Sequence, residues 1–307
     1  MKFENIFESE FIHDSYSCRK GKGTHFGIER IDSFIRKCSK NYKEECYVLK
    51  LDIRSYFMSI NKNILFAKLQ KIINEKYFYF DKNVLISLCK KVIFNNAIEN
   101  CEIVSSFDKW GDLPKSKSLF YAKENCGLPI GNYTNQVFAN FYLNEFDHFV
   151  KSNLKIRYYG RYVDDFVLVS KDRRELVECI SKITEYLKNN LELDTHPKKI
   201  YLQNINQGVE FLGVYIKPWR KYITPRIKNN SYLLIGDINK FLYMGRGSDI
   251  KNVEIRAQLN SYLGVLKHTN SFNLRKRLIS NLDEKFFDCF EVNNDFSIVK
   301  LKEITGN

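Results

Sequence analysis

The sequence lacks the features that mark membrane and secreted proteins. Only five of its 307 residues are proline, and no apolar run reaches the length of about 18 residues that a membrane-spanning helix needs. The first residues include Glu4, Glu8 and Glu10 instead of a basic stretch followed by an apolar one, so they do not resemble a secretory signal. We therefore expect no membrane partner and a cytoplasmic location.

Paired cysteine motifs are also missing. The eight cysteines are scattered without a C-x-x-C pair, and the five histidines show no ligand spacing with them. This pattern argues against a structural zinc site and against a disulfide framework. We expect reduced and mostly buried thiols.

Basic residues and aromatic residues are abundant. Lysine and arginine number 49 against 36 acidic residues, which leaves a formal net charge of +13. The 24 phenylalanines and 19 tyrosines indicate a folded chain with a large core, not a disordered one. A positive surface on a folded protein favours a polyanionic partner, and nucleic acid fits this charge best because phosphate neutralisation releases counterions.

The apolar pattern alternates irregularly between helical and strand periods. Strands are predicted at 46–52, on both sides of the acidic pair Asp164 and Asp165, and around 198–203 and 208–216. Helices are predicted at 28–40, 61–77, 83–94, 132–152 and 173–191, and the tail from about residue 226 is mainly helical. The sequence thus predicts an α+β core followed by a helical end.

Three aspartates are the candidate chemical centre. The stretch "YGRYVDDFVLVS" places Asp164 and Asp165 at a turn between two strand-forming runs, and Asp52 ends the strand "VLKLDI". A lone aspartate in a turn usually caps its own backbone. Two adjacent carboxylates repel each other and call for a cation, for which Mg²⁺ is the natural candidate. Asp52 and Asp164 on adjacent central strands would suit two-metal nucleotidyl transfer.

These motifs together resemble a reverse transcriptase. "YVDD" is similar to the family's palm-hairpin signature and "LDIRSYF" to its first catalytic motif, while "GLPIGNYTNQ" and "GVEFLGVYI" resemble the loop beneath the templating base and the primer-gripping hairpin. The resemblance implies metal ligation by Asp52 and Asp164, with the carbonyl of Ile53 and a supporting carboxylate from Asp165. It implies two Mg²⁺ ions, for which Mn²⁺ can substitute.

The resemblance also implies a right-hand polymerase fold with fingers, an antiparallel-sheet palm and a helical thumb. The fingers would take 1–45 and 61–125, the palm 46–60 and 126–222, and the thumb 223–307. The primer grip would be formed by Phe211, Leu212 and Gly213. The partners implied are a template RNA, a primer with its growing cDNA strand, and deoxynucleoside triphosphates.

Further residues take roles from the same resemblance. Phe57, five positions after Asp52, stands where the family places a steric gate against the ribose 2′-hydroxyl, although one phenylalanine among 24 more often packs in a core. Lys199 would be the general acid near the leaving pyrophosphate, and the neighbouring Lys198 is an alternative. Other nucleotide-binding candidates are Arg19, Lys20 and Lys22 in the basic loop, and Ile130, Gly131 and Gln136. A solvated charge run is the alternative for the basic loop.

Several motifs are similar to those of the reverse transcriptases of diversity-generating retroelements, which occur in prokaryotes or phages. That family shares the Ile-Gly-Asn pattern at Ile130, "KSLF" and "SYLGVLKHTNSFNLRK", although Asn135 stands where it usually has serine. The resemblance implies errors concentrated at template adenines. An apolar Ile130 would weaken discrimination against mispairs because it removes a hydrogen-bond partner near the nascent base pair. This subtype implies a small basic accessory protein and a structured RNA. The alternatives are a retron or antiviral defence reverse transcriptase and, more remotely, a non-catalytic RNA-binding relative.

Overall fold

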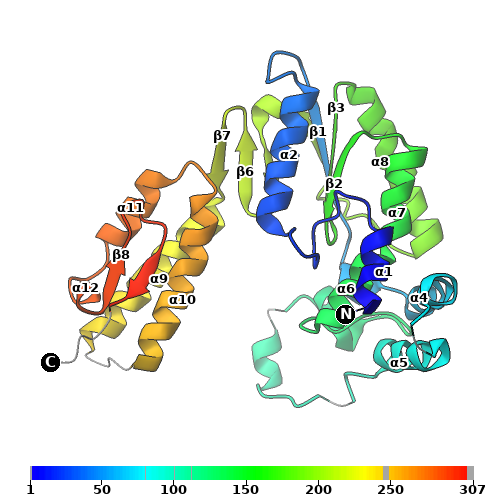
Figure 1. The fold of residues 1–307 in the computed structure, drawn as a ribbon, viewed down its shortest axis with the longest axis horizontal. Helices are drawn as coiled ribbons and strands as arrows, with labels where there is room; N and C mark the ends of the chain where they lie inside the picture. The colour runs from blue at the N-terminus through cyan, green and yellow to red at the C-terminus, as the bar shows by residue number, and fades with distance from the viewer. Residues whose placement is uncertain (1, 80, 100, 112, 245–248, 303–307) are drawn as a thin grey trace. The chain divides into compact units, whose positions relative to one another are not determined.

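The protein divides into two compact units, Met1–Asn204 and Ile205–Asn307. A computed structural model describes residues 2–79, 81–99, 101–111, 113–244 and 249–302 (Figure 1). All pairs of strands in its three sheets are antiparallel. The predicted α+β class with antiparallel sheets is therefore confirmed. No helix in these described ranges has the length and apolarity to cross a bilayer.

The first unit combines one sheet with helices. Its strands are β1 (Tyr47–Asp52), β2 (Tyr158–Tyr162), β3 (Asp165–Ser170) and β4 (Tyr201–Asn204). Its α-helices are α1 (Lys2–Glu10), α2 (Thr24–Cys38), α3 (Tyr56–Ser59), α4 (Lys62–Lys76), α5 (Lys82–Phe94), α6 (Tyr133–Tyr142), α7 (Asn144–His148) and α8 (Arg173–Leu191). Short 3₁₀ turns are η1 (Phe107–Trp110), η2 (Lys115–Lys117) and η3 (Leu119–Tyr121), and η4 (Phe149–Asn153) is a π-helical turn.

The sheet of the first unit has the strand order β2-β3-β1-β4, and its central strands β1 and β3 carry buried residues on both faces. Leu49 and Leu51 of β1 lie opposite Leu168 and Phe166 of β3, and these side chains join one core with α8. Alternate positions such as Val48 are also fully buried, as a strand covered on both faces requires. Helices α2 and α8 both pack against β3 (Figure 1).

The outer edge of β2 is covered by the N-terminal segment. The amide of Tyr16 donates to the carbonyl of Arg161 at 2.9 Å, and the amide of Arg161 donates to the carbonyl of Asp14 at 2.9 Å. The Tyr16 ring lies so close to Gly160 that a Cβ there would come within 2.2 Å of the tyrosine hydroxyl. Glycine is therefore required at 160 for this contact.

The prediction of one continuous helix over 132–152 is wrong. Asn132 is the N-cap, as its side chain accepts a hydrogen bond from the amide of Thr134 at 2.9 Å. The chain then leaves α-helical geometry at Leu143, with φ −91° and ψ 4°, so α6 is followed by the separate α7 and η4. The apolar pattern continues across the break because residues on both sides of it are buried, which hides the break from sequence periodicity.

The second unit contains more strands than predicted. Its elements are η5 (Ile205–Gln207), β5 (Val209–Phe211), β6 (Val214–Lys217), β7 (Arg220–Ile223), α9 (Pro225–Tyr243), α10 (Asp249–Lys267), α11 (Phe272–Ser280), α12 (Phe286–Cys289), β8 (Phe290–Val292) and β9 (Val299–Leu301). The strands β7, β8 and β9 were not expected, because "RKYI" has two exposed positions and the last two strands have only three residues each. Helices α9 to α11 and the final hairpin share a separate apolar core.

The boundary between the two units lies after Asn204, inside the segment 126–222 assigned to the palm. The predicted division into fingers, palm and thumb stays a prediction.

Candidate active site

The acidic pair sits at the hairpin between β2 and β3. Val163 and Asp164 form the turn, and Asp165 is the first residue of β3, where it lies opposite Asp52 of β1. Val163 adopts a left-handed φ of 55°, which is a strained conformation for a β-branched residue and costs about 1–3 kcal/mol. The structure thus brings the three predicted carboxylates to one end of the sheet.

The three carboxylates have different partners. Asp52 Oδ2 accepts a hydrogen bond from Lys199 Nζ at 2.9 Å, and Asp165 Oδ2 is paired with Lys50 Nζ at 3.1 Å. The other oxygen of Asp165 is buried and has no hydrogen-bond partner among the described residues. Asp164 forms no ion pair within that part of the chain. Because Asp165 is turned to Lys50, only Asp52 and Asp164 line the adjoining cavity.

Burial and mutual repulsion disfavour the charged forms of the hairpin carboxylates. Burial, followed by the charge of Asp52, raises the pKa of Asp164 to about 6. Burial also raises the pKa of Asp165 to about 6, although Lys50 opposes the shift. The group of carboxylates is therefore short of positive charge, which is the condition for binding a cation.

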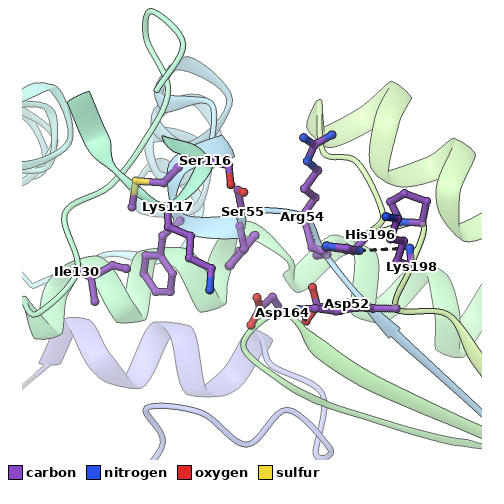
Figure 2. Close-up of a pocket in the computed structure, with 15 residues that line it drawn as sticks. Asp52, Arg54, Ser55, Ser116, Lys117, Ile130, Asp164, His196 and Lys198 are labelled. Carbon is purple, nitrogen blue, oxygen red and sulfur yellow. Dashed lines mark hydrogen bonds and ion pairs between the residues drawn. The ribbon is translucent and has the colours of Figure 1, made fainter. Parts of the chain in front are cut away.

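The cavity beside Asp52 and Asp164 has a volume of about 740 Å³. Figure 2 shows the two carboxylates side by side at its floor, with Lys117 and Ile130 on one side and His196 on the other. Such a space fits a nucleotide-sized ligand.

A loop next to β1 fixes one wall of the cavity. The amide of His196 donates to the carbonyl of Asp52 at 2.8 Å, and the amide of Arg54 donates to the carbonyl of Asp194 at 2.9 Å. These bonds bring Lys199 to Asp52, and the hydrogen bond with Asp52 raises the pKa of Lys199. Lys198 also lines the cavity, so both lysines that the sequence proposed are present and only Lys199 contacts a carboxylate.

Phe57 and Ile130 face the same cavity. The amide of Leu128 donates to the carbonyl of Phe57 at 2.8 Å, which ties α3 to the segment that carries Ile130. Phe57 is partly buried against the main core, whereas Ile130 is 66% exposed. Both side chains therefore line the cavity, and the gate role of Phe57 and the nucleotide-binding role of Ile130 stay predictions. Ile53 also lines the cavity.

The basic loop is not part of this cavity. Arg19 donates to both carboxylate oxygens of Glu8 and to the carbonyls of Ile12 and Ser15, and its side chain is only 5% exposed. Lys22 donates to the carbonyl of His13, and burial lowers its pKa to about 8. Arg19 and Lys20 line a different cavity of about 490 Å³. Bonds within the protein thus occupy Arg19 and Lys22, and their nucleotide-binding role stays untested.

Gly131 and Gln136 also lie outside the lining of the cavity beside Asp52 and Asp164. Gly131 has a φ of 110° after Ile130, and Gln136 accepts a hydrogen bond from the thiol of Cys18 at 3.2 Å. The primer-grip candidates are in the second unit. Phe211 is fully buried, and Leu212 and Gly213, with φ values of 51° and 82°, form the turn between β5 and β6.

Sequence reasoning missed several lining residues. Arg54 and Ser116 were not singled out, and Lys117 was noted only within "KSLF". Lys117 extends its amino group toward Asp164 in Figure 2. Ser116 and Lys117 come from η2, a short turn inside a region that carries no apolar period, so only that "KSLF" match pointed to them.

The donor set suits a divalent metal bound together with a ligand. The described residues contain no group of three or more His, Cys, Asp or Glu side chains placed to hold a metal ion. Asp52 and Asp164 supply two carboxylates, and the backbone carbonyl of Ile53 is the third candidate donor. Magnesium commonly binds through one or two carboxylates and completes its shell with water and substrate phosphates. The fit therefore rests on two carboxylates at an open cavity, of which Asp52 is paired with Lys199 and Asp164 has no ion pair among the described residues.

Comparison with known proteins identifies the family. Residues 2–216 match the model of the reverse transcriptase (RNA-dependent DNA polymerase) family, which is more than half of the chain. The chain belongs to the reverse transcriptase family. Polymerases of this family use a divalent metal, which agrees with the carboxylates of this reverse transcriptase.

Two curated proteins are similar to this reverse transcriptase. Protein YkfC of Escherichia coli is 24% identical over 245 residues, covering 69% of this chain and 57% of its own length. A putative COX1/OXI3 intron 2 protein of Saccharomyces cerevisiae is 25% identical over 262 residues, covering 72% of this chain and 29% of its own. The chain thus spans less than two thirds of either relative.

Solved telomerase structures share the fold of this reverse transcriptase. The apo telomerase from Candida tropicalis matches with a TM-score of 0.54 and 15% identity, over 92% of this chain and 53% of that one. Telomerase from the same organism, in complex with a fragment of telomeric RNA, matches with a TM-score of 0.51 and 14% identity, over 91% and 50%. The predicted polymerase fold is confirmed by this likeness.

Proposed function

We propose that the protein is an RNA-directed DNA polymerase that extends a primer on a template RNA by metal-dependent nucleotidyl transfer. The observation that carries this proposal is that Asp52 and Asp164 line one cavity, where burial and the charge of Asp52 raise the pKa of Asp164, in a member of the reverse transcriptase family. The partners proposed are template RNA, a primer with its cDNA strand, and deoxynucleoside triphosphates.

The side chains divide the chemical work. Asp52 and Asp164, with the carbonyl of Ile53, would hold two Mg²⁺ ions, or Mn²⁺ in their place. Such ions would activate the primer 3′-hydroxyl and stabilise the leaving oxygens. Asp165 keeps its contact with Lys50 and supports the hairpin. Lys199, which its hydrogen bond with Asp52 keeps protonated, is the proposed proton donor to the leaving pyrophosphate.

Other groups select and hold the nucleotide. Phe57 blocks the space that a ribose 2′-hydroxyl would need, which gives preference for deoxynucleotides. Lys117 and Arg54 bring positive charge to the cavity for the triphosphate. Within the proposed hand-like division, the segments 46–60 and 126–222 act as the palm, 1–45 and 61–125 as fingers and 223–307 as the thumb, with Phe211 to Gly213 gripping the primer.

Primer extension tests the proposal. Purified protein with an RNA template, an annealed DNA primer, deoxynucleotides and Mg²⁺ should lengthen the primer, and Asp164→Asn should not. Equal extension by both proteins would disprove the metal assignment. RNA binding by the parent without any extension, on several templates and with Mn²⁺ as well, would favour the non-catalytic RNA-binding alternative.

We further propose that the enzyme is of the diversity-generating type and makes errors at template adenines. The supporting observation is the exposed Ile130 in the lining of the cavity, where its apolar side chain offers no hydrogen bond to an incoming nucleotide. A small basic accessory protein and a structured RNA belong to this proposal.

Sequencing of the cDNA tests the subtype. Errors concentrated opposite adenine, and reduced by Ile130→Gln, would support it. Accurate cDNA from the parent protein would instead favour a retron or antiviral defence role.

A further inference from the structure

A buried ion pair lies beneath the catalytic hairpin. Arg161 of β2 donates from Nε to Asp147 Oδ1 at 2.7 Å and from Nη2 to Asp147 Oδ2 at 2.5 Å, and both side chains are fully buried. Tyr159 donates its hydroxyl to the same carboxylate at 2.6 Å. Burial disfavours the charged form of Arg161, but the charge and hydrogen bonds of Asp147 outweigh it, and the pKa of Arg161 lies above its ordinary value.

The pair belongs to a larger polar network. Arg161 Nη2 also donates to the carbonyl of Asn140 at 3.2 Å, and the Asn140 side chain accepts from Ser15 and donates to the carbonyl of Ser17. The guanidinium is thus fixed from several sides by α6, α7 and the N-terminal segment. A planar fork held in this way has little rotational freedom.

The remaining nitrogen of Arg161 reaches the strained turn. Its Nη1 donates to the carbonyl of Val163 at 2.9 Å, and Val163 is the residue with the left-handed φ of 55°. That carbonyl belongs to the same planar peptide unit as the amide of Asp164. A hydrogen bond that fixes the carbonyl therefore fixes the plane from which the Asp164 side chain extends.

We propose that Arg161, locked by Asp147, is a positioning residue that holds Val163 in its strained conformation and so directs the Asp164 carboxylate into the cavity. The inference deepens the proposed polymerase function and rests on it. Arg161 itself is buried and is not part of the cavity lining, so it acts through the backbone of the turn.

The first test separates positioning from general stability. Arg161→Lys keeps the charge but loses the fork, and we expect kcat to fall about a hundredfold with little change in the KM for deoxynucleotides, because a small misplacement of a reacting group has effects of that size. Arg157→Lys is the matched control, because it makes the same arginine-to-lysine change at an exposed position, and it should retain the kcat and KM of the parent. Parent values for kcat in Arg161→Lys would overturn the proposal.

The second test is rescue at the turn. Glycine adopts a left-handed φ without strain, so adding Val163→Gly to Arg161→Lys should restore kcat at least about tenfold. Val163→Ala also shortens the side chain but keeps the Cβ that disfavours a left-handed φ, so it should rescue much less than glycine. Equal effects of glycine and alanine would show that Arg161 does not act by holding this conformation.

Metal binding can be measured without catalysis, so it tests this inference separately from the polymerase proposal. Electron paramagnetic resonance can measure Mn²⁺ binding to the protein without nucleotide or primer, and Arg161→Lys should weaken it about tenfold, as for other supports of metal ligands. Unchanged Mn²⁺ affinity in that variant would overturn the inference even if no template is ever copied. An inactive parent whose Mn²⁺ binding depends on Arg161 would count against the polymerase proposal alone.

Folding of the variants is checked by circular dichroism. Should Arg161→Lys not fold, the pair is replaced by Arg161→Gln with Asp147→Asn, which removes both charges and keeps hydrogen-bonding atoms. Val163→Gly and Val163→Ala are then compared in that double variant by their Mn²⁺ affinity. Recovery with glycine alone would support the proposal, and equal effects of the two would overturn it.

Discussion

Two charged pairs at the catalytic hairpin are built in opposite ways. Arg161 and Asp147 are fully buried, and their charges and hydrogen bonds are satisfied by one another and by neighbours. Lys199 and Asp52 meet through one bond at the edge of a cavity, where the lysine is 47% exposed. An ion pair that is buried and bonded on several sides is a rigid support, whereas one at the edge of an open cavity can exchange its partner for a ligand. We call Arg161–Asp147 the enclosed side and Lys199–Asp52, with the adjoining Asp164, the open side.

The largest expected effect tests the open side. Asp164→Asn removes a charge that binds cations but keeps the size of the side chain, and primer extension should fall by about 10³-fold or more. The exposed Asp237→Asn is the control and should leave extension unchanged. A single-turnover extension assay measures both, and a loss of less than tenfold would contradict the role of Asp164.

The next effect tests the enclosed side. Asp147→Ala leaves the buried Arg161 without its partner, which should lower the free energy of unfolding by about 3–5 kcal/mol. Glu145→Ala, two residues earlier, breaks only a pair with Lys68 in which the carboxylate is 55% exposed, and it should cost less than about 1 kcal/mol. Urea denaturation followed by circular dichroism compares the two variants, and similar losses would show that burial does not distinguish the two ion pairs.

A smaller effect distinguishes the two neighbouring lysines of the open side. Lys199→Ala should reduce kcat about a hundredfold through loss of proton transfer, while Lys198→Ala, which lines the cavity without contacting a carboxylate, should change it only a few-fold. Steady-state kinetics with a short RNA template give both values. A larger loss in Lys198→Ala would transfer the general-acid role to that residue.

The smallest expected effect is on the free energy of unfolding of the metal-free protein, which should depend on pH through Asp164. The folded protein raises the pKa of Asp164 to about 6, above the ordinary 3.8, so it binds this proton more tightly than the unfolded chain does. The protonated Asp164 therefore stabilises the folded state at acidic pH, and this contribution is lost as the pH rises from about 4 to about 6. In EDTA, Asp164→Asn should gain stability relative to the parent between pH 4 and 7, on the order of 1 kcal/mol because the group is partly exposed. A constant difference across this range would contradict the raised pKa.

The sequence predicted the open side better than the enclosed side. Asp52, Asp164 and Asp165 could be placed because each follows or precedes a strand-forming run, and strand ends are visible in the local pattern. Asp147 and Arg161 were not recognised, because they are 14 residues apart and an acidic residue in a predicted helix looks like a solvated one. Their pairing depends on how α7 packs against β2.

Long-range packing also explains the other differences. Arg19 reads as a free cation in a glycine-containing loop, but α1 brings Glu8 to it, which no local pattern indicates. The choice between Lys198 and Lys199 depended on backbone bonds between the ends of β1 and the loop at His196. The break at Leu143 and the polar strand β7 left no periodic signal, so both were missed.

The N-terminal cover on β2 has a consequence for handling the protein. Without the bonds from Asp14 and Tyr16 to Arg161, β2 would become an open edge with free backbone donors and acceptors, next to the apolar strand β3. Such edges pair with other molecules and seed aggregation. A chain shortened beyond Tyr16 should therefore be poorly soluble even though every proposed catalytic residue lies later in the sequence.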